Sequence, residues 1–318
     1  MTLKALEFTD LIIESDSTGG VRSAWYRVTN GDGPRQRMAP AELLPEINGI
    51  ERTLRASLVA GQKNLALRHD DVPYRVQFCR FDGNTDVWFV SRGMDPLPPL
   101  SAFNMPPRME SHLMALGRRN GIILACGPMS SGKTTFLCSL LQSLVSRYGE
   151  TGITIEDPPE LPLQGEYPNN GHIYQWDLTR HSLPVLMEDV LRTRAAYLLI
   201  GEIRTAEAAA AAVIASLNGM CVLGSIHADD IRQAMVRLIS MATSREGDWA
   251  RTAIAEGLLA SINLHMSRIA GRRSFKITTL VAGDGSCPVR GLIRQNKLEQ
   301  LPAEVQRQQD AMSNALAV

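Results

Sequence analysis

The sequence predicts an α/β domain preceded by a smaller α+β domain. Three observations lead to this: the first part of the chain is rich in strand patterns, a proline-rich stretch follows, and short apolar strands then alternate with helices. Uninterrupted apolar strands are typical of a sheet that helices cover on both faces. At 318 residues the chain suits two domains of unequal size. We therefore expect an N-terminal domain over residues 1–92, a linker over 93–107 and a larger domain over 108–318.

The N-terminal domain is predicted from strand and helix patterns. Phe8–Ile13 and Ala24–Val28 are β-branched and aromatic runs, which favour a pair of strands. Ala41–Leu58 carries apolar residues at helical spacing. Val72–Phe81 and Thr85–Val90 flank the turn-forming triplet Asp82-Gly83-Asn84, which predicts a hairpin.

After the N-terminal domain, the sequence predicts a linker and then alternating strands and helices. Five prolines between Arg92 and Pro107 predict a stiff, extended path without regular elements. The alanine run Ala208–Ala212 favours helix, and the polar stretch Glu299–Val318 is expected to form a helix with a frayed end. The predicted strands are Ile122–Cys126, Ile153–Glu156, Leu198–Gly201 and Val222–Ser225.

Composition disfavours several classes of protein. Lysine plus arginine and aspartate plus glutamate each total 33, so the whole chain carries no positive field for a nucleic-acid backbone. We find neither a run of about 18 apolar residues nor a signal-peptide pattern at Met1–Asp10, and expect a cytoplasmic protein. The five cysteines form no C-x-x-C pair, so we expect no zinc and treat them as small buried hydrophobes.

One motif points to phosphate binding. Residues 127–134 match G-x-x-x-x-G-K-[ST] without a substitution, after a predicted strand and before a predicted helix. Main-chain N–H groups at such a helix start would surround phosphate, Lys133 would reach the β- and γ-phosphates, and Thr134 would hold magnesium. We therefore predict ATP and Mg²⁺ as ligands. The predicted nucleotide-binding residues are Gly127, Pro128, Met129, Ser130, Ser131, Gly132, Lys133, Thr134 and Thr135.

Three further strands end in polar side chains. Leu198–Gly201 is followed by Glu202, a carboxylate suited to polarising the attacking water or supporting magnesium. The strand Ile153–Glu156 ends in a second acid, and His227 follows a third strand.

The order of these motifs resembles the secretion ATPase superfamily of type II and type IV secretion and type IV pilus motors. Within it the PilT-like branch of pilus retraction ATPases is the most similar, with DotB-like relatives close. The phosphate loop is followed by an Asp box (Thr154–Glu160), a Walker B strand (Leu199–Arg204) and a His box (Gly219–Ala228). Pro288–Arg294 is similar to the A-I-R-N-L-I-R motif of the PilT branch.

The resemblance implies a RecA-like P-loop ATPase domain behind a PAS-like domain, assembled as a homo-hexamer with nucleotide between the two domains. It implies that Glu156 and Glu202 lie at the γ-phosphate, that His227 senses it, and that an N-terminal arginine reaches a phosphate from another domain or subunit. It also implies a platform protein of the inner membrane as partner. The candidate catalytic residues are Glu202, Glu156, His227, Arg75, Arg80, Arg92 and Arg204, and the candidate magnesium ligands are Thr134 and Glu202.

The sequence also departs from the pilus-motor pattern. Leu191-Arg192-Thr-Arg194-Ala-Ala stands where those motors read L-R-x-D-P-D, and its arginine spacing is similar to type IV secretion ATPases. His227-Ala-Asp229 replaces H-T-N. A retraction-type pilus motor is our leading hypothesis, and the ATPase of a conjugative or Dot/Icm-like secretion system is the alternative.

Two other classes stay open. A nucleic-acid translocase on the same core is disfavoured by the neutral charge, and a nucleotide-gated subunit with weak hydrolysis is disfavoured by the intact Lys133, Thr134 and Glu202. From the resemblance we also expect Arg290 and Arg294 to contact a partner or a neighbouring subunit, so that replacing both would spare folding.

Overall fold

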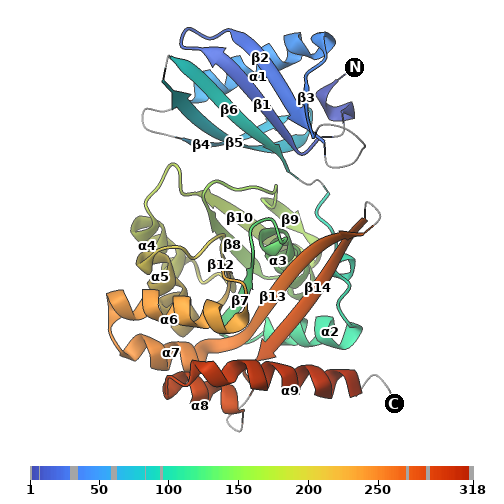
Figure 1. Cartoon of the computed structure of the whole chain (residues 1–318). Coiled ribbons are helices and arrows are strands. Elements are labelled where there is room, and N and C mark those ends of the chain that lie inside the picture. Colours follow the sequence, from blue (N-terminus) through green and yellow to red (C-terminus); the bar gives the residue numbers. More distant parts are fainter. Residues whose placement is uncertain are drawn as a thin grey trace. The chain divides into compact units, whose positions relative to one another are not determined.

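The computed structural model describes residues 2–6, 8–28, 35–58, 63–82, 84–93, 96–269, 272–283 and 287–314. Gly83 of the expected hairpin turn and residues 315–318 of the expected C-terminal helix lie outside these ranges. The chain divides into two compact units. Unit 1 comprises Met1–Pro96 together with Asp157–Pro162, and unit 2 comprises Leu97–Glu156 together with Leu163–Val318. Figure 1 labels the elements of both units.

Unit 1 is built on a six-stranded antiparallel sheet with the order β3-β2-β1-β6-β5-β4. The expected hairpin is present, because β5 pairs with β6. β3 and β4 were missed by the sequence patterns, since β3 has three exposed residues and β4 carries only two large apolar residues, Leu65 and Leu67. The elements are η1 (Leu3–Ala5), β1 (Asp10–Asp16), β2 (Val21–Arg27), β3 (Gln36–Met38), η2 (Ala41–Leu43), α1 (Leu44–Ser57), β4 (Asn64–His69), β5 (Val72–Phe81) and β6 (Thr85–Arg92).

One face of this sheet and one face of α1 form the core of unit 1. On α1, Ile47, Ile50 and Leu54 recur at helical spacing, and all three are buried. They belong to the same apolar cluster as Ile13 of β1 and Trp88 of β6. Alternate residues along β1 are buried, so one face of this strand contributes to the core.

Unit 2 is built on an eight-stranded mixed sheet with the order β14-β13-β7-β12-β11-β8-β10-β9. The strands from β13 to β10 run parallel, and an antiparallel strand closes each edge. The four predicted strands are β7, β8, β11 and β12. The strands are β7 (Gly121–Gly127), β8 (Thr151–Glu156), β9 (Gly165–Tyr167), β10 (Gly171–Asp177), β11 (Tyr197–Ile200), β12 (Cys221–His227), β13 (Leu258–Ile269) and β14 (Arg272–Val281).

Helices cover both faces of this sheet. Every residue of β7 is buried, as a strand packed on both sides requires. Ile122 and Leu124 share an apolar cluster with residues of α4 to α8, while α3 also contacts the sheet. The helices are η3 (Leu100–Phe103), α2 (Pro107–Leu116), α3 (Lys133–Tyr148), η4 (Pro168–Asn170), α4 (Leu183–Thr193), α5 (Ala206–Leu217), α6 (Ile231–Glu246), α7 (Trp249–Gly257), α8 (Pro288–Arg294), η5 (Leu298–Gln300) and α9 (Leu301–Asn314).

The proline-rich stretch is less extended than its composition predicts. Its second half forms η3, in which Leu100 and Phe103 are buried. The Phe103 ring lies edge-on to Phe136 of α3, with ring centroids 5.2 Å apart, and 4.8 Å from Phe275 of β14. Burial of these two side chains outweighs the preference of the flanking prolines for extended backbone.

Three of the five cysteines are buried as expected, namely Cys126, Cys138 and Cys221, while Cys79 and Cys287 are half-buried. Burial raises the pKa of the Cys126 thiol to about 11, so it stays protonated at neutral pH. No helix in the described ranges has the length and apolar character needed to cross a membrane.

Candidate nucleotide site

Four adjacent parallel strands of unit 2 bring the predicted site together. β7, β12, β11 and β8 are neighbours in that order and run in the same direction. Their carboxyl ends therefore meet at one edge of the sheet, where open α/β folds bind ligands. Gly127 ends β7, His227 ends β12, Glu202 follows β11 and Glu156 ends β8.

Glycine allows the turn between β7 and α3. Gly127 has φ +147°, and a Cβ at this position would lie 2.3 Å from the Leu264 carbonyl oxygen. Gly132 has φ +89° and precedes the first residue of α3. A left-handed backbone and close packing are both tolerated by glycine alone. The loop therefore presents the free N–H groups of the α3 N-terminus, the positive end of the helix.

One side chain of the loop, Ser131, indicates an anionic ligand. Ser131 is buried, and its hydroxyl makes no hydrogen bond to the described part of the chain. A buried hydroxyl without a partner costs free energy, which a bound phosphate oxygen would recover. Thr134 and Thr135 are half-buried in the first turn of α3, whereas Met129 is 80% exposed at the tip.

Lys133 is the buried cation of the site. Its Nζ donates hydrogen bonds to the carbonyl oxygens of Gly127 at 2.9 Å and Pro128 at 2.7 Å. It also lies 3.3 Å from Nδ1 of His227. The side chain is thus folded back against its own loop and against β12.

Glu202 and His227 face each other across the ends of β11 and β12. His227 Nε2 lies 3.4 Å from Glu202 Oε1, and both side chains are about one-third exposed. The loop that carries Glu202 is held to β12, because the Ile203 N–H donates to the Ser225 carbonyl at 2.7 Å and the Ser225 hydroxyl donates to the Gly201 carbonyl. The carboxylate is therefore accessible on a fixed main chain.

Glu156 differs from Glu202 in its surroundings. It is only 3% exposed. Its Oε1 accepts hydrogen bonds from the Thr154 hydroxyl at 2.7 Å and the Gln175 amide at 3.1 Å. A Cβ on Gly201 would lie 3.0 Å from Glu156 Cγ, so a larger residue there would press against this acid. Glu156 is thus fixed by its neighbours, whereas Glu202 is open to solvent and contacts His227.

The three arginines predicted in unit 1 each have a different partner. Arg75 of β5 pairs with Glu160 at 2.5 Å. Arg92 of β6 donates to the carbonyl oxygens of Leu6 and Lys4. Both Nη atoms of Arg92 are therefore used in holding the N-terminal segment. Arg204, the remaining predicted arginine, is exposed in the loop after β11.

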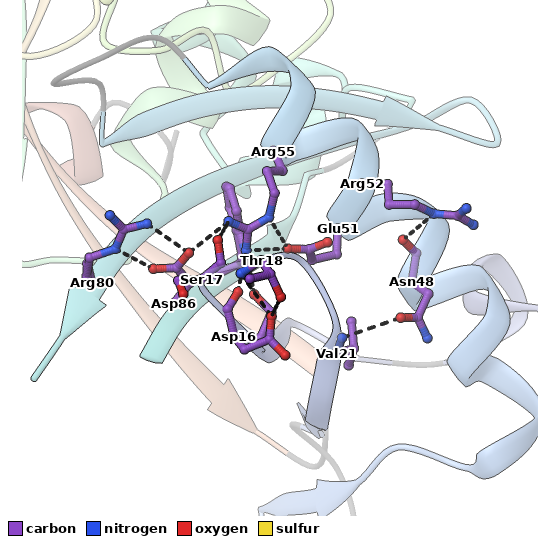
Figure 2. A network of polar contacts seen from close by, with 12 residues as sticks. Asp16, Ser17, Thr18, Val21, Asn48, Glu51, Arg52, Arg55, Arg80 and Asp86 are labelled. Carbon is purple, nitrogen blue, oxygen red and sulfur yellow. Dashed lines mark hydrogen bonds and ion pairs between the residues drawn. The ribbon is translucent and has the colours of Figure 1, made fainter. Parts of the chain in front are cut away.

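Arg80 takes part in a polar network around Asp86. Nε and Nη2 of Arg80 donate to the two carboxylate oxygens of Asp86 at 2.7 Å and 3.0 Å. Arg55 of α1 donates to the same carboxylate at 2.9 Å and also bonds Glu51. Figure 2 shows Asp86 between the two arginines. The Arg80 side chain is nevertheless 55% exposed, because its outer edge faces away from Asp86.

Asp86 is the residue that the sequence analysis missed here. It is fully buried, on the same face of β6 as Trp88 and Val90. An acid at a core position of an alternating strand requires a cation as partner. That pattern was visible in the sequence and would have predicted the pairing with an arginine.

The oxygen donors at the sheet edge suit magnesium. Mg²⁺ prefers oxygen ligands and is commonly held by one or two protein groups together with phosphates and waters. Thr134 and Glu202 supply a half-buried hydroxyl and an accessible carboxylate. Among the described residues, the one group of three metal-binding side chains close together is Glu46, His69 and Asp70 in unit 1.

Comparison with known proteins agrees with this geometry. The sequence model of the family described as Type II/IV secretion system protein matches residues 57–275. The twitching motility protein of Neisseria gonorrhoeae is 29% identical over 190 residues, covering 58% of this chain and 49% of that protein. The chain thus spans about half the length of this relative.

Two solved structures share the fold. The Legionella pneumophila ATPase DotB aligns with a TM-score of 0.72 at 19% identity, covering 94% of this chain and 85% of that one. The pilus retraction motor PilT with bound ADP aligns with a TM-score of 0.72 at 20% identity, and the alignment covers 94% of this chain and 86% of that one. These likenesses confirm the expected fold, a RecA-like α/β unit behind a smaller N-terminal unit.

Proposed function

Because the chain belongs to the Type II/IV secretion system protein family, we propose that it is an ATP-hydrolysing motor of a pilus or secretion machine. One observation carries this proposal: an intact phosphate loop lies at the same sheet edge as an accessible carboxylate, Glu202, in contact with His227. A phosphate-binding loop without a nearby acid would bind nucleotide but would not be expected to hydrolyse it. The added acid supplies what hydrolysis needs, a group that orients and polarises water.

Each residue of the site has a proposed role. The main chain of the loop and Lys133 would bind the β- and γ-phosphates, and Thr134 and Glu202 would hold magnesium, which would neutralise charge developing on the phosphates. Glu202 orients the attacking water, since it is the more accessible of the two acids. The buried Glu156 supports the edge of the site beside Gly201.

We further propose that the motor acts as a homo-hexamer and that an arginine of unit 1 completes the site of a neighbouring subunit. The core motifs themselves supply a lysine to phosphate, and an arginine provided from elsewhere can raise the rate on the order of a thousandfold. Arg75 and Arg80 are both about half exposed, while Arg92 is engaged with main-chain carbonyl oxygens. Exposure therefore favours Arg75 and Arg80 over Arg92 for this role.

The machine that we propose is a retraction-type type IV pilus, with the motor at the cytoplasmic face of the inner membrane and a platform protein of that membrane as partner. The likeness to the twitching motility protein and to the motor PilT supports it. The second candidate is a type IV secretion system, which is supported by the similarity to DotB and by the arginines of Leu191-Arg192-Thr-Arg194.

The proposal is tested by steady-state hydrolysis of Mg-ATP by the purified full chain. We expect phosphate release that saturates with ATP and disappears in Lys133→Ala. Stimulation of that rate by single-stranded DNA would favour a nucleic-acid translocase instead. In cells, Lys133→Ala expressed in place of the wild type should abolish twitching motility if the machine is a pilus. Loss of substrate transfer with normal motility would assign the motor to secretion.

A further inference from the structure

Three side chains that can bind a metal ion lie close together in unit 1. They are Glu46 of α1, His69 at the end of β4 and Asp70 in the turn that follows. One potential ligand atom of each lies within 4.8 Å of those of the other two. All three residues belong to unit 1, whereas the phosphate loop belongs to unit 2.

The turn between β4 and β5 places Asp70 directly beside His69. His69 pairs with Val72, so Asp70 and Asp71 are the two residues of a tight hairpin turn. Their φ angles are 49° and 64°, and positive φ at both positions is what a type I′ turn requires. Aspartate and asparagine adopt this left-handed backbone more readily than most residues. The position of Asp70 is therefore set by a short, regular connection.

Glu46 and His69 already lie at a separation that suits a shared ion. His69 Nε2 lies 2.9 Å from Glu46 Oε1, and the two side chains are 30% and 19% exposed. Two atoms that each lie about 2.0–2.1 Å from one zinc ion are about 3 Å apart at ordinary coordination angles. The other oxygen of Glu46, Oε2, accepts a hydrogen bond from the Leu3 N–H at 2.9 Å. That bond fixes the carboxylate and leaves Oε1 facing the histidine, as outer hydrogen bonds do for metal ligands.

A buried hydroxyl without a partner lies on the same face of the β4–β5 hairpin. Tyr74 of β5 is 3% exposed, and its hydroxyl makes no hydrogen bond to the described part of the chain. Tyr74 lies opposite Leu67, and His69 is two residues further along β4, so all three side chains share one face. A buried hydroxyl without a partner costs free energy, which a water bound to a metal ion would recover.

The charges around this hydroxyl include those of the cluster. Burial raises the pKa of Tyr74, the charge of Arg92 lowers it, and the charges of Glu46 and Asp70 raise it. The hydroxyl is thus within electrostatic reach of both carboxylates. In the described part of the chain, neither Glu46 nor Asp70 forms an ion pair with a lysine or an arginine. A divalent cation would supply the positive charge that two neighbouring carboxylates need.

We propose that Glu46, His69 and Asp70 bind one divalent transition-metal ion of the zinc class, with water as a further ligand and the Tyr74 hydroxyl bonded to that water. An imidazole among the ligands favours zinc over magnesium and calcium, which prefer oxygen alone. No cysteine takes part, so the absence of C-x-x-C pairs does not bear on this site. The ion joins α1 to the turn between β4 and β5 and thereby stabilises unit 1.

The experiment is a calorimetric titration of the full chain with zinc, after dialysis against a chelator and without nucleotide. Thiolates also bind zinc, so the half-buried Cys79 and Cys287 are first replaced by serine. We expect one zinc ion per chain, and no comparable binding of magnesium or calcium at the same concentration. The measurement does not depend on ATP hydrolysis, so it can fail or succeed independently of the proposed motor function.

Asp70→Asn and Asp71→Asn are the matched pair of variants. Both residues are exposed acids of one turn with positive φ, which asparagine tolerates, so both variants should fold. We expect Asp70→Asn to weaken zinc binding more than about a hundredfold, and Asp71→Asn less than about threefold. Glu46→Gln and His69→Gln should match Asp70→Asn. Tyr74→Phe removes only a hydrogen bond to bound water and should weaken binding about tenfold.

Several outcomes would overturn the inference. The first is the absence of zinc binding to the full chain. The second is an unchanged zinc affinity in Asp70→Asn, which would place the ion elsewhere. An equal loss in Asp70→Asn and Asp71→Asn would mean that the turn attracts cations only through its net charge. Magnesium or calcium binding as tightly as zinc would exclude a role for the imidazole, and an unchanged affinity in Tyr74→Phe would remove the hydroxyl from the site.

Discussion

Arg290 of α8 donates a hydrogen bond from Nη1 to the carbonyl oxygen of Ala255, in the last turn of α7, at 2.9 Å. The same guanidinium also bonds the carbonyl oxygens of Gly283, Glu256, Leu258 and Ala282. Arg290 is 8% exposed. The final carbonyl groups of a helix have no partner within the helix, and here an arginine from the neighbouring helix supplies one. The sequence-based expectation that Arg290 contacts another protein is therefore wrong for this residue.

We predict that Arg290→Ala destabilises unit 2 by about 2–4 kcal/mol, because it leaves several buried carbonyl groups without donors. Urea unfolding of the full chain measures the loss. Arg294→Ala is the control: Arg294 pairs with Glu256 at 3.0 Å but is 48% exposed, and exposed pairs contribute about 0–1 kcal/mol. Equal stability of the two variants would contradict the structural role of Arg290. A partner contact can still be tested at Arg294, whose side chain is accessible.

We predict that Lys133→Ala abolishes turnover, whereas Glu202→Gln binds ATP and hydrolyses it on the order of 10²- to 10⁴-fold more slowly. The first substitution removes the charge that holds the phosphates. The second keeps the size of the side chain and removes the charge that polarises water. Binding of a fluorescent ATP analogue and phosphate release, measured on the same preparations, separate the two defects.

Because Glu202 is accessible and Glu156 is buried, we expect substitutions of the two acids to affect kcat differently. If Glu202 is the acid that orients water, Glu156→Gln should reduce kcat less than Glu202→Gln does. The double substitution should be no slower than Glu202→Gln alone, since an essential group can be lost only once. Rapid hydrolysis by Glu202→Gln would transfer the role to Glu156.

We predict that activity depends on assembly. Specific activity should rise with protein concentration, and Arg75→Ala or Arg80→Ala should lower kcat on the order of a thousandfold while ATP affinity is roughly retained. Mixing inactive Lys133→Ala with the inactive arginine variant should restore part of the activity, because one subunit then supplies the arginine and the other the loop. A dilute monomer that keeps full activity would rule out a contribution from a neighbouring subunit.

The sequence predicted the centre of unit 2 well because its strands are buried on both faces. β7 and β11 are apolar runs with no polar interruption, β8 and β12 are mostly apolar with Thr154 and Ser225 in their interiors, and the phosphate-loop motif fixes the turn after β7. Edge strands were harder to predict. The hairpin of β13 and β14 was missed, since strands near a sheet edge carry polar residues and lose the simple pattern.

Side-chain contacts within the site were predicted only in part. The motif order was enough to nominate Glu202 and His227, and the structure brings them to 3.4 Å. The different environments of Glu156 and Glu202 could not be read from two similar strand ends, because burial depends on residues such as Gln175 that come from β10. Arg290 was misjudged because its position on α8 predicts a helix face but not what packs against it.

The last prediction concerns Asp86 and follows from its charge. Hydrogen bonds from Arg80, and then Arg55, hold the pKa of Asp86 below its ordinary value near 3.8, although burial acts in the opposite direction. As pH falls, Asp86 therefore takes up its proton at a higher pH in the unfolded chain than in the folded chain. Its contribution to stability is fully present above the ordinary pKa and is lost as pH falls through the lower pKa of the folded state.

We predict that Asp86→Asn, which keeps the shape of the side chain and removes its charge, lowers the stability of unit 1 at pH 7, and that its difference from wild type narrows as pH falls below about 4. Urea unfolding at a series of pH values, in a background with Trp176 and Trp249 replaced by phenylalanine, reports on unit 1 through Trp25 and Trp88. Asp71→Asn is the matched control, because Asp71 is 88% exposed and lies 4.0 Å from Arg68. Its difference from wild type should be small at every pH. A difference for Asp86→Asn that stays constant down to pH 3 would mean that the carboxylate charge contributes nothing, and that Arg55 and Arg80 require only a hydrogen-bond acceptor at this position.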